Sequence, residues 1–360
     1  MPVNQTYATF SDTAFASAFI IYALALIISL VYYVKIQGVI DARREASRVK
    51  ELVGTGTGAG AGTAGGSTAA GAVDALDRDH FNDDHDLPGA ADINDGLVAD
   101  EALEARQASA RKLANMTQTL VWLGVIVHLV SIVLRGLSAD RFPFGNLYEY
   151  VLVVTFGAMA GAAFLLQRPQ LRVMWPWVIT PMIALLFYGG TELYADSAPV
   201  VPALQSFWFP IHVSTVSIGG SIGIVSGIAS LLYLLRMWQP KGREKGFFGA
   251  VAKPLPSAKT LDNLAYKTAI WTVPVFGLGI ILGAIWAEAA WGRFWGWDPK
   301  ETVSFITWIL YAGYLHARAT VGWRDTRAAW INVVALVTMV FNLFFINMVV
   351  SGLHSYAGLN

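Results

Sequence analysis

The sequence contains no cysteine in its 360 residues. This absence excludes disulfide bonds, thiolate metal sites, a cysteine nucleophile and a Cys-x-x-Cys-His attachment motif in the chain itself. Charged residues are also scarce: they make up 14% of the chain, against about 25% in an average soluble protein. Lys and Arg together number 25, as do Asp and Glu. This balance argues against a nucleic-acid-binding protein.

The few charged residues are concentrated in one segment. Residues 36–117 contain 22 of the 50, so only 28 are left for the other 278 residues. Hydrophobic residues make up 55% of the chain, more than the roughly 45–50% of soluble domains. Such a chain cannot cover a water-soluble globule with polar side chains. We therefore interpret it as a membrane protein with one polar insertion.

Eight apolar runs are long enough, or nearly so, to cross a hydrocarbon core of ~30 Å at 1.5 Å per residue. They predict an all-α, polytopic membrane helix bundle with about eight transmembrane helices. The seventh run is the weakest by length, and the first lacks the basic region and cleavage site of a signal peptide. The runs lie near residues 14–34, 116–134, 150–166, 173–190, 211–235, 268–287, 302–317 and 329–350.

Lys and Arg are unevenly distributed between the connections of these runs. If successive connections alternate between the two sides, one side holds 21 of these residues and the other holds four. Basic loops tend to remain in the cytoplasm, so this ratio predicts that both termini face outward. Without Lys35 and the long insertion the ratio is still 12:4.

Three regions follow from this pattern. Residues 1–35 are expected to form the first transmembrane helix, and residues 36–115 a polar cytoplasmic insertion. Residues 116–360 are expected to form the main membrane domain, with an outward loop at residues 286–301.

The insertion itself has three parts. Residues 38–52 predict a short charged helix that continues the first span. Residues 54–72 are rich in Gly, Ala and Thr and predict a flexible linker. Residues 74–104 carry eleven acidic residues and predict a long disordered or weakly helical segment. His80 and His85 lie in it, but their spacing matches no calcium loop, so a solvated acidic segment is the favoured interpretation.

The outward loop is unusually rich in tryptophan. Aromatic belts at the membrane interface explain one or two such residues, but not four within twelve residues. Glycines between them let the backbone approach closely, and the indoles supply flat apolar faces for a large planar ligand. Two basic residues flank the loop and are expected to meet acidic groups of that ligand. The residues concerned are Trp286, Trp291, Trp295, Trp297, Gly292, Gly296, Arg293 and Lys300.

Asp298 has a structural interpretation as well as a functional one. With Pro299 and Glu301 it forms a near capping box for the seventh span. A helix start fixed in this way also fixes the tryptophan loop, so a ligand contact of Asp298 is not excluded.

Two histidines are expected level with this loop. His212 lies at the outward start of the fifth span, and His354 lies just after the outward end of the eighth. Two neutral imidazoles can bind a haem iron from opposite faces, with the ring against the aromatic residues. The alternative is that each is an ordinary interfacial residue.

His128 and His316 lie inside spans, where polar groups are costly and often functional. Their predicted depths differ by roughly 10 Å in straight helices, which is awkward for a shared iron. The alternatives are a hydrogen bond between helices for His128 and an interfacial position for His316.

The segment WGRFWGWDPKE, from Trp291 to Glu301, resembles the tryptophan-rich WWD motif of haem-handling proteins. FGNLYE (144–149), LQSFWFPIHV (204–213) and SGLHSYAG (351–358) resemble further family segments in the same order. The sequence thus resembles the CcsA (ResC) family of system II cytochrome c biogenesis over roughly residues 116–360. The eight spans and the flanking histidine pair favour CcsA over the related CcmC and CcmF proteins. The first 115 residues depart from the family core.

The resemblance implies a haem-transporting cytochrome c haem lyase subunit that acts with a CcsB (ResB)-like partner. It would move haem b, bound non-covalently as a substrate, to the outer face for thioether attachment to apocytochrome c. A thioredoxin-like protein would keep the acceptor thiols reduced. His212 and His354 match the outward iron ligands, and His316 matches a transmembrane ligand. The opposite ligand of His316 would come from the partner, with His128 as a candidate in this chain.

Two other functions remain open at this stage: a haem exporter that forms no bond, and a scaffold in an assembly complex. The expected location is the plasma (inner) membrane, with the thylakoid membrane as the alternative. The residues expected to contact haem are His212, His354, Trp291, Trp295, Trp297, Gly292, Gly296, Arg293, Asp298, Lys300, His316 and His128.

Overall fold

The computed structural model describes residues 3–56, 98–323 and 325–354, and these residues contain helices but no strand. Seven of the helices are long and apolar enough to cross a membrane, which confirms a polytopic helical membrane protein. These seven are α1 (Gln5–Gly56), α2 (Val98–Ser138), α3 (Leu147–Leu165), α4 (Trp175–Thr191), α5 (Trp208–Trp238), α7 (Ala258–Trp291) and α9 (Thr326–Met348).

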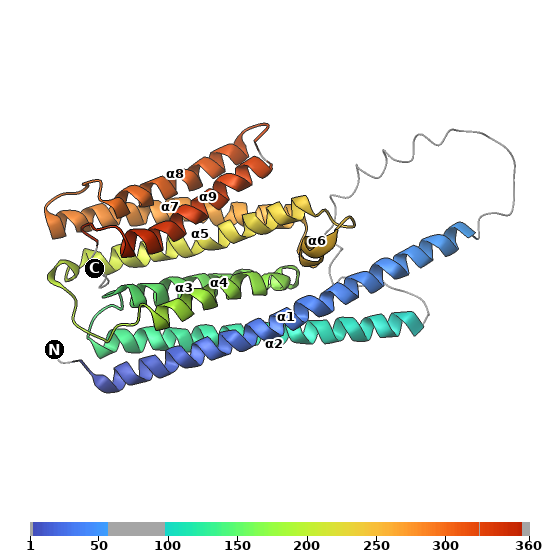
Figure 1. The fold of residues 1–360 in the computed structure, drawn as a ribbon, viewed down its shortest axis with the longest axis horizontal. Coiled ribbons are helices and arrows are strands. Elements are labelled where there is room, and N and C mark those ends of the chain that lie inside the picture. Colours follow the sequence, from blue (N-terminus) through green and yellow to red (C-terminus); the bar gives the residue numbers. More distant parts are fainter. Residues whose placement is uncertain (1–2, 57–97, 324, 355–360) are drawn as a thin grey trace.

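The expected number of about eight spans is reached only when α8 (Pro299–Ala319) is included. This helix has 21 residues, which corresponds to about 31 Å at 1.5 Å per residue. It runs beside α7 and α9 (Figure 1) and packs on both. It has no stretch of membrane-spanning length as apolar as those of the other seven, and charged residues lie near both of its ends, so it does not meet the same hydropathy criterion.

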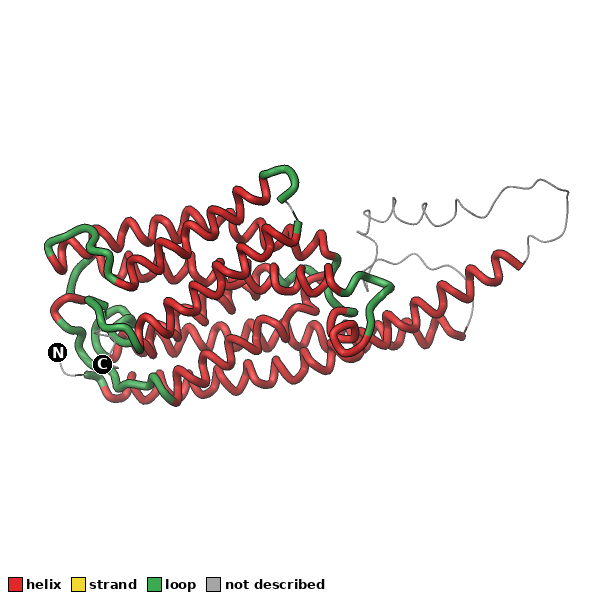
Figure 2. Tube along the Cα trace, turned by 45° about the horizontal axis from the view of Figure 1, so that its top comes forward, coloured by secondary structure: helices red, strands yellow, loops and turns green. Residues whose placement is uncertain are grey.

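The helices are arranged as successive antiparallel pairs along one long axis (Figure 1). α1 packs against α2, α3 against α4, α5 against α7, and α8 against α9. The α3–α4 pair lies between the α1–α2 pair and the group formed by α5, α7, α8 and α9. The start of α1 and the end of α9 lie at the same end of the bundle (Figures 1 and 2). The charge distribution of the loops predicts that this end faces outward, so we call it the outer end and the opposite one the cytoplasmic end.

The first two helices extend well beyond the membrane-spanning length. α1 continues through the predicted charged helix 38–52, and α2 begins at Val98, before the apolar run that starts near residue 116. Residues 98–112 are rich in Ala, Glu and Arg, which favour helix even in water. Residues 57–97 lie outside the described residues, and with them most of the Gly-rich and acidic segments, His80 and His85.

The cytoplasmic end of α1 is attached to the loop that contains α6 (Gly246–Ala252). The Tyr33 hydroxyl donates to the Val251 carbonyl, and Arg44 forms an ion pair with Glu244 at 3.1 Å. Glu244 also pairs with the buried Arg236 of α5 at 3.2 Å. The first helix is thereby connected to the rest of the bundle, although it precedes the segment that resembles the family.

α5 and α7 lie very close together because glycine occupies the contact on both. A Cβ at Gly219 of α5 would lie 2.6 Å from the Phe276 backbone nitrogen, and one at Gly279 of α7 would lie 2.9 Å from the Val216 Cα. Small residues allow this approach of two backbones inside a membrane. The carbonyl oxygens of α7 are thereby brought within hydrogen-bonding reach of α5 side chains.

Candidate ligand-binding site at the outer end of the bundle

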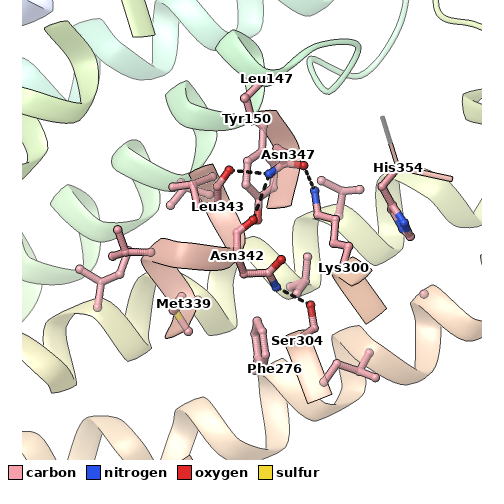
Figure 3. Close-up of a pocket in the computed structure, with 18 of the residues that line it drawn as sticks. Leu147, Tyr150, Phe276, Lys300, Ser304, Met339, Asn342, Leu343, Asn347 and His354 are labelled. Carbon is pink, nitrogen blue, oxygen red and sulfur yellow. Dashed lines mark hydrogen bonds between the residues drawn. The ribbon is translucent and has the colours of Figure 1, made fainter. Parts of the chain in front are cut away.

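A cavity of about 720 Å³ lies between the α3–α4 pair and the helices α5, α7 and α9. Apolar side chains line it along most of α5, from Phe209 to Leu235. The charged and imidazole groups of the lining lie at the outer end, where Figure 3 shows Lys300, Asn347 and His354. The cavity therefore combines a long apolar interior with a polar outer end.

His212 is held by the close contact between α5 and α7. Its Nδ1 lies 2.8 Å from the Gly279 carbonyl oxygen, and the ring is stacked on Trp286 with an interplanar angle of 12°. A Cβ at Gly283 would lie 2.6 Å from the His212 Cε1. Because a carbonyl only accepts, Nδ1 carries the proton, and Nε2 keeps the lone pair of a neutral ring.

His354 is held in the same manner by a carboxylate. Its Nδ1 lies 2.7 Å from Asp298 Oδ2, and its ring packs edge-on against Trp291 at a centroid distance of 5.1 Å. Burial lowers the pKa of the His354 imidazole, and the bond to Asp298 offsets only part of that effect. His354 is therefore neutral at pH 7, with its proton on Nδ1.

The four tryptophans do not play equal parts. Trp286 is fully buried in the last turns of α7 and lies 5.8 Å from the His212 ring and 5.9 Å from the His354 ring. Trp291 and Trp295 line the cavity. Trp297 has a positive φ of 57° and a side chain that is 67% exposed, so it packs beside Trp295 at the surface instead. Trp286 thus joins the two histidines, which the sequence did not indicate.

The two basic residues of the motif, Arg293 and Lys300, have different contacts. Arg293 Nη1 pairs with Glu301 Oε1 at 3.2 Å, and its guanidinium lies over the Trp291 ring. Lys300 lines the cavity and donates to the Asn347 side-chain oxygen, as Figure 3 shows. Lys300 is therefore the cation available to an acidic group inside the cavity, whereas Arg293 stabilises the loop.

The two glycines of the loop contribute to its conformation. Gly292 ends α7 in the left-handed conformation with φ of 68°, which glycine adopts without strain. At Gly296 a Cβ would lie 2.0 Å from the Arg293 guanidinium. Gly292 is thus required by the turn, whereas Gly296 leaves room for the Arg293 side chain, and the contact of both glycines with a ligand stays a prediction.

Asp298 caps α8 as expected, but its carboxylate contacts residues 353 and 354 and does not line the cavity, so its ligand contact stays a prediction. It is the N-cap residue of α8, and the Glu301 carboxylate accepts from its backbone N–H at 3.1 Å. Its own carboxylate reaches residues 352–354, the described part of the chain end, where Oδ1 accepts from the Leu353 N–H at 2.8 Å. Burial alone would raise the pKa of this carboxyl, but the bonds from His354 and Leu353 bring it below its usual value.

The two histidines inside spans lie elsewhere. His128 is fully buried in α2, with Nδ1 3.5 Å from the Tyr22 hydroxyl and its ring edge-on to Phe156. His316 is exposed on α8. α2 packs on α1 and α3, whereas α8 packs on α7 and α9. The structure therefore does not bring His128 and His316 together, and neither lines the cavity described above.

The sequence did not single out several residues of the site. Lys300 lies 5.7 Å from the Tyr150 ring of α3 and donates to Asn347 of α9, and Asn342 of α9 donates to Ser304 beside them (Figure 3). Gly279 and Gly283 set the position of His212. Tyr150 directly follows the FGNLYE segment, whereas the asparagines lie inside an apolar run. Two buried polar residues five positions apart in such a run were the available signal.

These features define an integral membrane protein with an aromatic cavity that two histidines border at its outer face. The sequence profile of the cytochrome C assembly protein family matches residues 144–354, which include both histidines. The cytochrome c biogenesis protein CcsA of Guillardia theta is 35% identical over 63% of this chain and 80% of its own length. CcsA of a Synechococcus species is 31% identical over 70% and 87% of the two chains. CcsA of Gloeobacter violaceus is 30% identical over 63% and 81%.

This chain therefore belongs to the CcsA family of system II cytochrome c biogenesis proteins and takes part in cytochrome c maturation. The match begins at residue 144, so α1, α2 and His128 precede it.

Proposed function

We propose that this protein binds haem at its outer end and presents it for covalent attachment to apocytochrome c, as the haem-handling subunit of a cytochrome c synthase. One observation carries the proposal. Two neutral imidazoles border the same aromatic cavity, and each has its Nδ1–H bound to an acceptor, so that Nε2 carries the lone pair. This is the form in which histidine binds a metal, with the second nitrogen oriented by a hydrogen bond.

Each part of the cavity has a role in this proposal. His212 and His354 bind the iron, and Trp291 and Trp295 hold the ring of the substrate. Lys300 meets a propionate carboxylate. Each reduced thiol of the acceptor Cys-x-x-Cys-His adds across one vinyl group, the sulfur to carbon and the proton to the neighbouring carbon. No oxidant is needed. The protein contributes mainly binding and orientation, and the acceptor histidine replaces one axial ligand.

His316 suggests a second position for haem. Its side chain is exposed on the surface of α8, where a CcsB (ResB)-like membrane protein can supply the opposite ligand. His128 is enclosed by α1, α2 and α3, so within this chain it is not the opposite ligand of His316. Haem taken up in the membrane would be held at His316 and then pass to the outer site. The CcsA relatives in cyanobacteria fit either the plasma or the thylakoid membrane.

The test is to purify the protein with its CcsB-like partner and to incubate it with a reduced apocytochrome c peptide. We expect the reduced optical spectrum of a bis-histidine haem and the formation of two thioethers on the peptide. Haem in the complex without thioether formation would favour an exporter. Absence of haem absorbance from the complex would favour a scaffold and contradict the proposal.

The different environments of the two basic residues give a further prediction. Lys300→Met is expected to weaken haem binding by roughly 10- to 100-fold, because a hydrogen bond to a charged group is worth about 1.5–3 kcal/mol. Arg293→Met is expected to have a smaller effect, because its guanidinium already pairs with Glu301. Titration of the purified complexes with haemin measures both. Equal losses would show that Lys300 has no special contact with the substrate.

A further inference from the structure

Asp298 makes contacts that its place at the start of a helix does not require. The residue is only 8% exposed, and both of its carboxylate oxygens have partners at the chain end. Oδ1 accepts from the Leu353 N–H at 2.8 Å, and Oδ2 lies 2.7 Å from His354 Nδ1. A Cβ at Gly352 would lie 2.7 Å from Oδ1, so the glycine there leaves room for this contact. The chain end is thus fitted around one carboxylate.

Among the residues that the structure describes, His212 has no carboxylate partner of this kind. Its Nδ1 lies 2.8 Å from the Gly279 carbonyl, which is neutral. Hydrogen bonds to an ionised acceptor are roughly twice as strong as those between neutral groups. A carboxylate behind a metal-binding histidine also raises the basicity of the ring. The two imidazoles therefore differ in electron-donating strength although they border the same cavity.

We propose that Asp298 is a positioning residue that fixes the tautomer of His354 and makes it the stronger of two unequal iron ligands. This inference rests on the proposed function, because it takes His212 and His354 as the ligands of haem. Asp298 itself does not contact the substrate. Its negative charge favours ferric over ferrous iron through His354, and it holds the chain end that carries the ligand.

The alternative is that Asp298 only caps α8. Asparagine and aspartate are about equally good at an N-cap. Asp298→Asn therefore preserves the cap but removes the negative charge behind His354. Asp325→Asn is the matched control: Asp325 is the N-cap residue of α9, its carboxylate accepts from the Arg327 N–H at 2.9 Å, and it lies at the other end of the bundle.

The experiment uses the complex with its partner, titrated with haemin and then followed by redox titration. Loss of an outer partner of a metal ligand typically costs 10- to 100-fold in affinity. We expect Asp298→Asn to lose about tenfold in ferric haem affinity and less in ferrous affinity. The midpoint potential should then rise by up to about 59 mV, the value of a tenfold change for one electron. Asp325→Asn should match the wild type. A wild-type potential and affinity in Asp298→Asn would overturn the inference.

A second measurement leaves Asp298 in place. In His354→Gly, added imidazole can fill the gap and donate its N–H to Asp298, whereas 1-methylimidazole has no N–H to donate. We expect imidazole to restore the spectrum at an about tenfold lower concentration, and the same comparison in His212→Gly to show a smaller preference. Equal preferences at the two positions would overturn the inequality of the ligands.

Different results would contradict the proposed function and the role of Asp298. If alanine at His212 and at His354 leaves the haem spectrum unchanged, the proposed function is wrong. If those variants lose haem while Asp298→Asn and the imidazole preferences show no effect, only the role of Asp298 is wrong.

Discussion

Alanine at both His212 and His354 is expected to leave the purified complex without haem at its outer site and to stop cytochrome c maturation. The two rings border one cavity and share contacts with Trp286, so removal of both leaves no imidazole there among the described residues. Partners behind a metal ligand are already worth 10- to 100-fold in affinity. We therefore expect the loss of both ligands to exceed about 100-fold. Haemin titration and the yield of covalent cytochrome c in cells measure it.

His128→Ala is the control for this double replacement. His128 lies against Tyr22 and Phe156 and does not line the cavity, so this variant should retain the haem of the outer site. Retention of a bis-histidine spectrum in the double variant would show that the ligands lie elsewhere, for example on the partner. A smaller but detectable loss of haem in His316→Ala would be consistent with a separate site at the α8 surface.

Much of this arrangement follows from local sequence patterns. Hydropathy predicts the long helices, and an even number of crossings places both chain ends on one side. His212 begins one apolar run and His354 follows another. Counting the membrane crossings therefore predicts that both histidines lie at the same end of the bundle. The capping role of Asp298 is a short-range pattern as well, because the Asp-Pro-x-Glu spacing is read within one turn. Each of these predictions depends on residues that are neighbours in the chain.

Long-range contacts could not be predicted in this way. Arg293 and Lys300 flank the same motif, and only the folded chain shows that Glu301 binds Arg293 whereas Lys300 meets Asn347. The bond between Asp298 and His354 joins the start of α8 to the segment that follows α9. Trp297 was expected in the cavity because it belongs to the motif. Its backbone has a positive φ, and its side chain is exposed at the surface instead. His128 was compared with His316 by depth alone, and depth does not show which helices are neighbours.

Glu149→Ala is expected to destabilise the protein strongly, although Glu149 does not bind the ligand. The carboxylate is fully buried, and its Oε1 lies 3.0 Å from Arg135 Nε. Oε2 lies 2.7 Å from Arg141 Nη1 and accepts from the Gly145 N–H at 2.6 Å. Removing one partner of a buried ion pair typically costs about 3–5 kcal/mol, because the remaining charge is left uncompensated. With an unfolding entropy of about 2.1 cal/mol/K per residue, that corresponds to a fall of roughly 4–7 °C in melting temperature for 360 residues.

The cavity would be affected as well, because Glu149 lies next to Tyr150 at the start of α3 and fixes the loop before it. Glu192→Ala is the matched control at the same end of the bundle: Glu192 is exposed at the end of α4, and such substitutions usually stay within about ±0.5 kcal/mol. Glu149→Gln separates charge from hydrogen bonding. Far-UV circular dichroism during heating in detergent measures all three variants. A melting temperature of Glu149→Ala equal to that of Glu192→Ala would mean that Asp12, 3.6 Å from Arg135, replaces the lost carboxylate.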